Sequence, residues 1–234
     1  MQTGFKTQCI PDYRLLTEEQ IEEIHQATLA LLEKTGVKVL NQEALQLLKN
    51  AGCRIVDETI VRIPAGLVEE SIQHAPSHVT VYNRNGEPAM ELGGTNVCFG
   101  MGTDLLNTWD LKTGQLRPSC LQDVIDAAVV GDYCAEIDFI ASNAFPLEVP
   151  GHLAFVLEFK ALMENSPKPI YFTSAGSQDL EVILEMASHV LGGKDRLREK
   201  PFIIHYAEPI SPLVHSCGAV DKLFMCADNG IPLN

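Results

Sequence analysis

The sequence predicts an α/β protein in which residues 96–234 form the first half of a (β/α)₈ barrel. Past Thr95, short apolar runs typical of strands alternate with longer segments of helical periodicity, and their starts lie 29–40 residues apart. This alternation is the mark of βαβ units and a parallel sheet. Residues 1–95 lack the alternation and are expected to form an N-terminal α+β cap. The five expected strands begin at Val97, Ile137, Ile170, Phe202 and Ile231.

The cap region carries clear helix boundaries. Thr17 and Gln20 form a capping-box pattern, and the helix that they start is expected to end at Gly36. A second helix is expected from the N-cap Asn41 to Gly52. The remaining elements expected in this region are strands at Cys53–Val56 and Ile60–Ile63, a helix from Pro64 through Ile72, a strand at His78–Tyr82 and a turn at Arg84–Glu87.

Helical patterns separate the strands of the second region. Three serines are expected to start helices there: Ser119, in a capping box with Gln122, then Ser177 and Ser216. An insert at Leu105–Leu116 resembles a hairpin that turns around Lys112-Thr113-Gly114. The four expected helices span Leu121–Val130, His152–Met163, Leu180–Leu191 and Ala219–Ala227.

Right-handed crossovers leave two architectures for such a chain, a doubly wound sheet and a barrel. A dinucleotide-binding sheet requires G-x-G-x-x-G, whereas Gly100-Met101-Gly102 lacks the third glycine. We therefore favour the barrel. It needs eight strands to close, so four βα units and a begun fifth strand indicate a fragment or a truncated product. A complete smaller α/β domain remains the alternative. A half barrel alone is expected to self-associate or be partly molten and inactive, and the full-length protein is expected to be a homo-oligomer.

Composition excludes several function classes. The net charge of −14 predicts a surface that repels phosphate, which argues against nucleic acid and anionic membranes as partners. Apolar runs are too short for a membrane span, and Met1–Tyr13 lacks the apolar region of a secretory signal. The seven cysteines are an odd number without a C-x-x-C pair, which is typical of reduced thiols in a cytoplasmic protein. No metal-binding motif is present, so no bound metal is expected.

In a (β/α)₈ barrel the active site lies at the carboxyl ends of the strands, so residues just past each strand are the candidates. Most have a structural alternative: turn geometry for Asp104, a buried core position for His205, and simple packing for Phe99 and Tyr206. Asn143 and Thr173 have another, which is to satisfy buried backbone groups. An aromatic face beside a carboxylate, as Tyr206 and Glu208 suggest, suits a quaternary ammonium ligand. We assign no individual catalytic residue. The candidates for substrate binding are Phe99, Asp104, Asn143, Thr173, His205, Tyr206 and Glu208.

Several segments, in order along the chain, resemble the trimethylamine methyltransferase family. They are Leu16–His25, Leu32–Val37, Ile63-Pro64, Cys98–Asp104, the Glu-Pro-x-Ser-Pro-Leu stretch of Glu208–Ser216, and Asn229–Pro232. The resemblance implies a complete (β/α)₈ barrel in full-length members. It also implies methyl transfer from a methylated amine to the Co(I) corrinoid (cobalamin) of a separate small protein, a reaction of methylamine metabolism. Some members carry pyrrolysine, and others act on quaternary amines such as glycine betaine. The position that distinguishes them lies beyond Asn234.

Three functional hypotheses follow. The first is corrinoid-dependent transfer of a methyl group from trimethylamine or a quaternary amine such as glycine betaine, with a corrinoid protein as partner. The second is a binding module that captures quaternary ammonium without turnover. The third is an inactive remnant.

Overall fold

The computed structural model describes residues 14–234, so Cys9 and the expected absence of a secretory signal in Met1–Tyr13 lie outside the described residues. The chain forms a mixed α/β structure with two compact units. The first unit comprises His78–Ala207 with Lys222–Asn234. The second comprises the described residues up to Ser77 with Glu208–Asp221.

These units divide the chain differently from the expected boundary at residue 95. The segment 78–93 belongs to the first unit because Val81 and Met90 are buried in a cluster with Ile204. The segment Glu208–Asp221 belongs to the second unit because it contains a strand of that unit's sheet.

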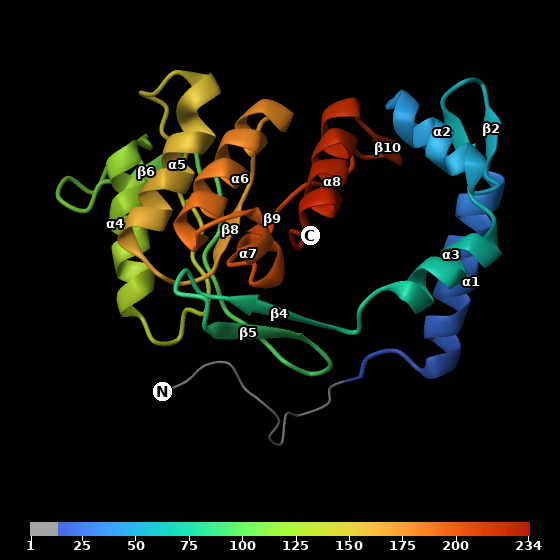
Figure 1. The fold of residues 1–234 in the computed structure, drawn as a ribbon, viewed down its shortest axis with the longest axis horizontal. Helices are drawn as coiled ribbons and strands as arrows, with labels where there is room; N and C mark the ends of the chain where they lie inside the picture. Colours follow the sequence, from blue (N-terminus) through green and yellow to red (C-terminus); the bar gives the residue numbers. More distant parts are fainter. Residues whose placement is uncertain (1–13) are drawn as a thin grey trace. The chain divides into compact units, whose positions relative to one another are not determined.

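The second unit is a small mixed sheet with three helices (Figure 1). Its sheet has the order β10-β1-β3-β2, in which β3 is antiparallel to both β1 and β2, and β10 is parallel to β1. In chain order the elements are α1 (Glu18–Lys34), β1 (Val37–Val39), α2 (Gln42–Asn50), β2 (Arg54–Val56), β3 (Ile60–Arg62), α3 (Ala65–His74) and β10 (Val214–His215).

Local signals in the sequence explain these boundaries. The Thr17 hydroxyl accepts a hydrogen bond from the Gln20 amide (3.2 Å), and the Gln20 side chain accepts one from the Thr17 amide (3.0 Å). Asn41 caps α2 by accepting from the Ala44 amide at 2.9 Å. Gly36 has φ +82°, and a Cβ atom there would lie 2.4 Å from the Val61 carbonyl oxygen, so only glycine fits. The capping box, the expected ends of α1 and α2, and the two expected strands at β2 and β3 are therefore confirmed.

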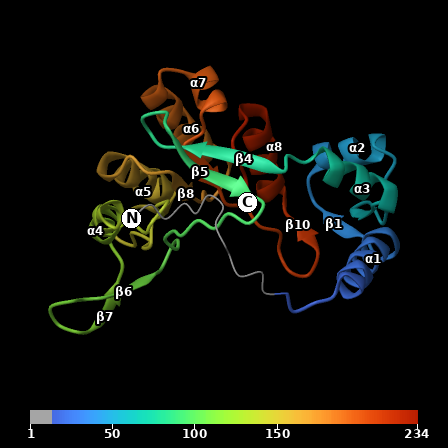
Figure 2. The ribbon, with the colours of Figure 1, turned by 90° about the horizontal axis from the view of Figure 1, so that it is seen from below.

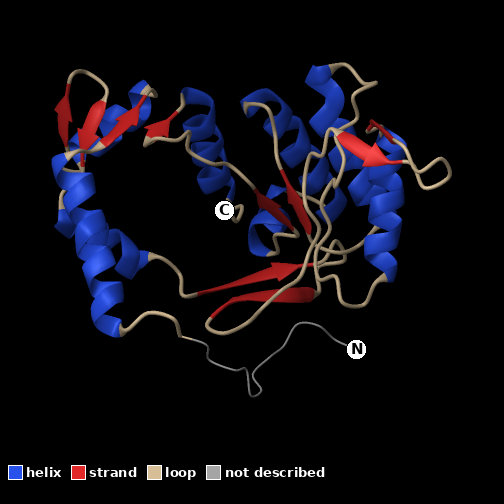
Figure 3. Ribbon diagram, turned by 180° about the vertical axis from the view of Figure 1, so that it is seen from behind, coloured by secondary structure: helices blue, strands red, loops and turns tan. Residues whose placement is uncertain are grey.

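The first unit contains the alternating region. Its helices α4, α5 and α6 stand side by side along β8 and β9 (Figure 1), and strands and helices form separate layers (Figure 3). Its elements are β4 (His78–Tyr82), β5 (Pro88–Gly93), β6 (Asn107–Trp109), β7 (Leu116–Pro118), α4 (Leu121–Tyr133), α5 (Gly151–Asn165), β8 (Ile170–Phe172), α6 (Ser177–Leu191), α7 (Lys194–Glu199), β9 (Ile203–His205) and α8 (Cys217–Asn229), of which the last continues from the second unit.

The five expected strand positions occur in parallel succession. Single bridges join Gly100 to Phe139, Ile140 to Ile170, and His205 to Leu233, and β8 pairs with β9 in parallel. Only the positions at Ile170 and Phe202 form strands of three residues, whereas the other three contribute isolated bridges. Residues 14–234 do not form a closed barrel. The expected architecture is present only as five strand positions that lie side by side, parallel and in chain order, here called the parallel series.

The two faces of this series pack differently. Ile170, Phe172 and Ile203 join the large buried core that the helices cover, together with Phe159 of α5 and Leu180 of α6. On the other face, Tyr171, Ile204 and Phe139 pack with the hairpin of β4 and β5. This alternation of side chains places neighbouring strand residues in different surroundings.

Two predicted helix caps are wrong. Cys120 rather than Ser119 precedes α4, because Asp123 accepts from the Cys120 amide at 2.9 Å, while the Ser119 hydroxyl bonds to Thr108. Ser177 is the first residue of α6, since its N-cap is Gly176. The cap at Ser216 is confirmed by a 3.3 Å hydrogen bond from the Ala219 amide.

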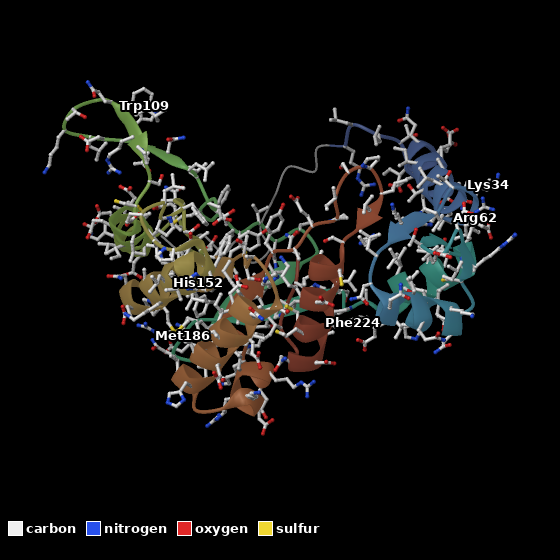
Figure 4. All side chains as sticks on the ribbon, turned by 90° about the horizontal axis from the view of Figure 1, so that it is seen from above. Lys34, Arg62, Trp109, His152, Met186 and Phe224 are labelled. Atoms are coloured by element: carbon white, nitrogen blue, oxygen red, sulfur yellow. The ribbon has the colours of Figure 1, made fainter. Side chains whose placement is uncertain are left out.

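The insert forms the predicted hairpin, with β6 antiparallel to β7 (Figure 2). The carboxylate of Asp110 accepts hydrogen bonds from the amides of Lys112 and Thr113, which shapes the turn. Trp109 on this hairpin is 65% exposed and stands away from the helices of its unit (Figure 4). In the described part of the chain, no helix has the length and apolarity needed to cross a bilayer.

Candidate functional site

The most distinctive polar cluster surrounds the carboxylate of Asp104, in the loop that follows the bridge at Gly100. The Ser142 hydroxyl donates to Oδ1 of Asp104 at 2.9 Å, and the Thr173 hydroxyl donates to Oδ2 at 3.0 Å. The Asp104 amide donates in turn to Ser142 Oγ at 3.0 Å. Ser142 follows the bridge at Ile140, and Thr173 follows β8. Residues at the C-terminal ends of three neighbouring parallel strand positions therefore hold the Asp104 carboxylate in a fixed orientation.

A second carboxyl group reaches this cluster from α5. Glu158 is 4% exposed and shares a hydrogen bond with Asp104, while its Oε1 has no hydrogen-bond partner in the described part of the chain. Burial, followed by the charge of Asp104 and this hydrogen bond, raises the pKa of Glu158 to about 9. Burial penalises the charged form, and two neighbouring carboxylates repel. Glu158 is therefore a neutral acid at physiological pH and donates to Asp104.

A row of aromatic rings lies on the face of the series opposite the helices. The ring centroids of Phe139 and Tyr171 are 5.8 Å apart, and those of Tyr171 and Tyr206 are 5.7 Å apart. Tyr206 follows β9 directly, and its amide donates to the Phe172 carbonyl at 2.8 Å. Such ring faces attract diffuse cations.

His205 lies on the helix-covered face and is fully buried. Its Nε2 bonds with the Ser174 hydroxyl at 2.9 Å, and its ring meets Phe172 edge to face with 4.9 Å between centroids. Its Nδ1 has no hydrogen-bond partner among residues 14–234. Burial, with the positive charge of Lys222, lowers the pKa of His205 to about 4, so the ring is neutral. This arrangement corresponds to the core position considered as the alternative for this residue.

The ammonium of Lys222 on α8 belongs to the same polar region. It donates to the Ser174 carbonyl at 2.9 Å, and burial lowers its pKa. Asp179 at the start of α6 favours its charged form and accepts from the amides of Ala175 and Gly176. Lys222 therefore helps to fix the segment that follows β8.

The structure brings together only some of the predicted site residues. Asp104 and Thr173 bond directly, whereas Tyr206 belongs to the aromatic row and His205 to the opposite face. Phe99 and Asn143 are exposed, and they contribute through their amides, which donate to Asp138 and to the Gly102 carbonyl. Glu208 is exposed and lies in the second unit. Their proposed roles in substrate binding stay predictions.

Four further residues of this region are not among the predicted substrate-binding candidates: Ser142, Glu158, Tyr171 and Lys222. Glu158 left a signal in the sequence, because it lies four residues after Ala154 and four before Leu162, on the apolar stripe of a predicted helix. A carboxyl group on a buried helix face requires a partner. Ser142 also stood at an expected strand end. No group of three or more His, Cys, Asp or Glu side chains in residues 14–234 could hold a metal ion.

Parallel neighbours that collect polar side chains at their carboxyl ends are typical of α/β enzymes. The model of the trimethylamine methyltransferase (MTTB) family matches residues 1–233, and the chain belongs to this family.

The chain is similar to curated proteins of the family. It is 32% identical to the trimethylamine methyltransferase MttB of Desulfitobacterium hafniense (strain DSM 10664 / DCB-2), over 93% of this chain and 44% of that protein. It is 26% identical to the glycine betaine methyltransferase of D. hafniense (strain Y51), over 95% and 46%. It is 30% identical to MttB of Methanosarcina thermophila, over 99% and 49%. The chain therefore spans just under half the length of these relatives.

Proposed function

We propose that the protein transfers a methyl group from a methylated amine, trimethylamine or a quaternary amine such as glycine betaine, to a Co(I) corrinoid held by a partner protein. The observation that carries this proposal is the family match across residues 1–233. The cluster around Asp104 supports it, because a positively charged amine needs a carboxylate that no cationic side chain neutralises.

We also propose that the parallel series is the first half of a (β/α)₈ barrel. The neighbours follow one another in chain order, from Gly100 through Phe139 and β8 to β9 and Leu233. The three hydrogen-bonding residues of the cluster come from the segments that follow the first three of these strand positions. This is the end of a barrel at which active sites lie.

The reaction requires positive charge on nitrogen. When the C–N bond breaks, its electron pair stays on the nitrogen, so a neutral amine would leave as an unstable anion. A quaternary ammonium is permanently charged, and a tertiary amine gains its charge by protonation. The corrinoid is the methyl acceptor and supplies the nucleophile.

The residues of this chain would bind and orient the cation. Asp104, held by Ser142 and Thr173, supplies a negative charge in a half-buried position, where attraction is stronger than in water. The rings of Tyr171 and Tyr206 offer faces that attract ammonium methyl groups without hydrogen bonding. Fixing the substrate in this way contributes to catalysis by orientation.

The corrinoid protein would dock where the strand ends open, since the acceptor must reach the amine methyl group there. The net charge of −14 argues against nucleic acid as the partner of this surface. A cytoplasmic location stays a prediction from the sequence.

The test is an assay of the full-length protein with Co(I) corrinoid protein and a panel of methylated amines, in which the absorbance of methylated corrinoid is measured. Asp104→Asn keeps the size of the side chain and removes its charge, so we expect transfer to fall at least about tenfold, equivalent to 1.4 kcal/mol. The matched control is Asp126→Asn, an exposed carboxylate on α4, which should leave transfer unchanged. Absence of transfer with every amine would refute the proposal, and amine binding without transfer would favour a binding module.

A further inference from the structure

The two carboxyl groups of the candidate site have an unusual set of partners. Asp104 accepts from two hydroxyl groups, which are neutral donors, and it neighbours the acid group of Glu158. Within residues 14–234, no Lys, Arg or His side chain forms an ion pair with it. Glu158 is almost fully buried, and one of its oxygens has no partner among the described residues. In the part of the chain that the structure describes, the pair thus has hydrogen-bond donors but no counterion.

Electrostatics determines the charge of such a pair. Two neighbouring carboxyl groups in a partly buried place cannot both ionise at moderate cost, so they hold one proton between them. The pair then carries a single negative charge, which resides on Asp104, the more accessible group. A partly buried charge without a counterion is costly, and a ligand of opposite sign removes part of that cost.

We propose that the Asp104–Glu158 pair receives the ammonium group of the substrate and that Glu158, as a positioning residue, partly releases the shared proton when the cation binds. This inference rests on the proposed function and deepens it, because it assigns the charge-recognition element of the site. A bound cation supplies the positive charge that the proton otherwise provides. Cation binding and proton loss are therefore linked.

The surroundings of Glu158 determine which charged group is coupled to its proton. The charged group that acts on it is Asp104, in the loop after Gly100. The elements packed around α5 contribute apolar side chains to the surrounding core, including Val124 of α4, Phe172 of β8 and Leu180 of α6. No described residue other than Asp104 is a source of charge for the shift of Glu158.

Tetramethylammonium is the suitable probe, because it carries no acidic hydrogen and any released proton must come from the protein. Isothermal titration calorimetry of the full chain at about pH 8, in two buffers of different ionisation enthalpy, measures the protons released on binding. We expect the wild type to release a substantial fraction of one proton. Its affinity should rise with pH between about 7 and 9, by up to tenfold per pH unit.

Glu158→Gln keeps a neutral donor of the same shape and removes the titratable proton. We expect this variant to bind tetramethylammonium with no proton release and with an affinity independent of pH. Glu164→Gln, an exposed position on the same helix that pairs with Lys160, should behave like the wild type.

The wild-type measurements alone decide the question if Glu158→Gln does not fold. Binding with no proton release and no pH dependence would overturn the inference, as would equal proton release from the wild type and from folded Glu158→Gln. Failure of the wild type to bind tetramethylammonium at all would also overturn it. The methyl-transfer assay then separates the two proposals, since transfer from any methylated amine would leave the proposed function standing.

Discussion

The buried acid on α5 predicts a stability that decreases with rising pH. Glu158 has an ordinary pKa of 4.5 in the unfolded chain and a pKa of about 9 in the folded protein. Between these values the folded state holds a proton that the unfolded state has lost. The contribution is therefore fully present below pH 4.5 and is lost as pH rises toward 9.

The expected magnitude follows from the shift. Each pH unit within this window lowers the free energy of unfolding by about 1.4 kcal/mol. At about pH 8 the accumulated loss is on the order of 4–5 kcal/mol, a large part of the stability of an ordinary domain. Glu158→Gln removes the titration. The difference in unfolding free energy between variant and wild type should therefore grow in favour of the variant by about 1.4 kcal/mol per pH unit.

Urea denaturation followed by circular dichroism, at a series of values from about pH 5 to pH 8.5, measures this difference. The informative quantity is the change of this difference with pH. Any effect of replacing an acid by an amide that does not depend on pH shifts all values equally and leaves this change unaffected. Glu164→Gln should give curves parallel to the wild type, since that side chain is exposed. If the curves of Glu158→Gln and the wild type are also parallel, the assignment of Glu158 as a buried neutral acid is refuted.

Two further outcomes are expected. Gly100→Ala should destabilise the first unit by about 1–3 kcal/mol, because its Cβ would lie 2.1 Å from the ring of Phe139. Gly102→Ala is the control, since no described residue places an atom within 4 Å of its Cβ. Equal melting temperatures of the two variants would contradict the packing described for Gly100. The lowered pKa of His205 means that its stabilisation is present above pH 6.5 and lost as pH falls toward 4, by up to about 3 kcal/mol. His205→Gln should remove this loss, and an unchanged acid limb of the unfolding curve would argue against a neutral buried ring.

Much of the fold could be predicted because its signals are local. The capping box at Thr17, the cap at Asn41 and the hairpin insert depend on residues a few positions apart, and the structure confirms them. The periodic apolar pattern likewise located α4, α5, α6 and α8. Strand β10 could not be predicted, because two residues have no periodicity and their pairing with β1 depends on a distant segment.

The candidate site was predicted only in part for a similar reason. Strand-end position alone selected Asp104 and Thr173, which bond to each other. The same criterion selected His205, which lies on the opposite face because side chains alternate along a strand. Glu158 enters from a helix, so its partnership with Asp104 depends on how α5 packs, which no local pattern reveals.

The pairing of β1 with β10 has a consequence for how the chain is made. Lys38 and Val214 are neighbours in the sheet, so the ribosome must add 176 residues after the first before the second exists. At ordinary elongation rates of about 5–20 residues per second, roughly 9–35 seconds pass between the synthesis of β1 and that of β10, the strand that pairs with its outer edge. Throughout that interval the nascent N-terminal segment exposes an unpaired strand edge, a site at which chaperones or neighbouring chains bind. The order of synthesis thus leaves this small sheet incomplete until Val214 and His215 have been made.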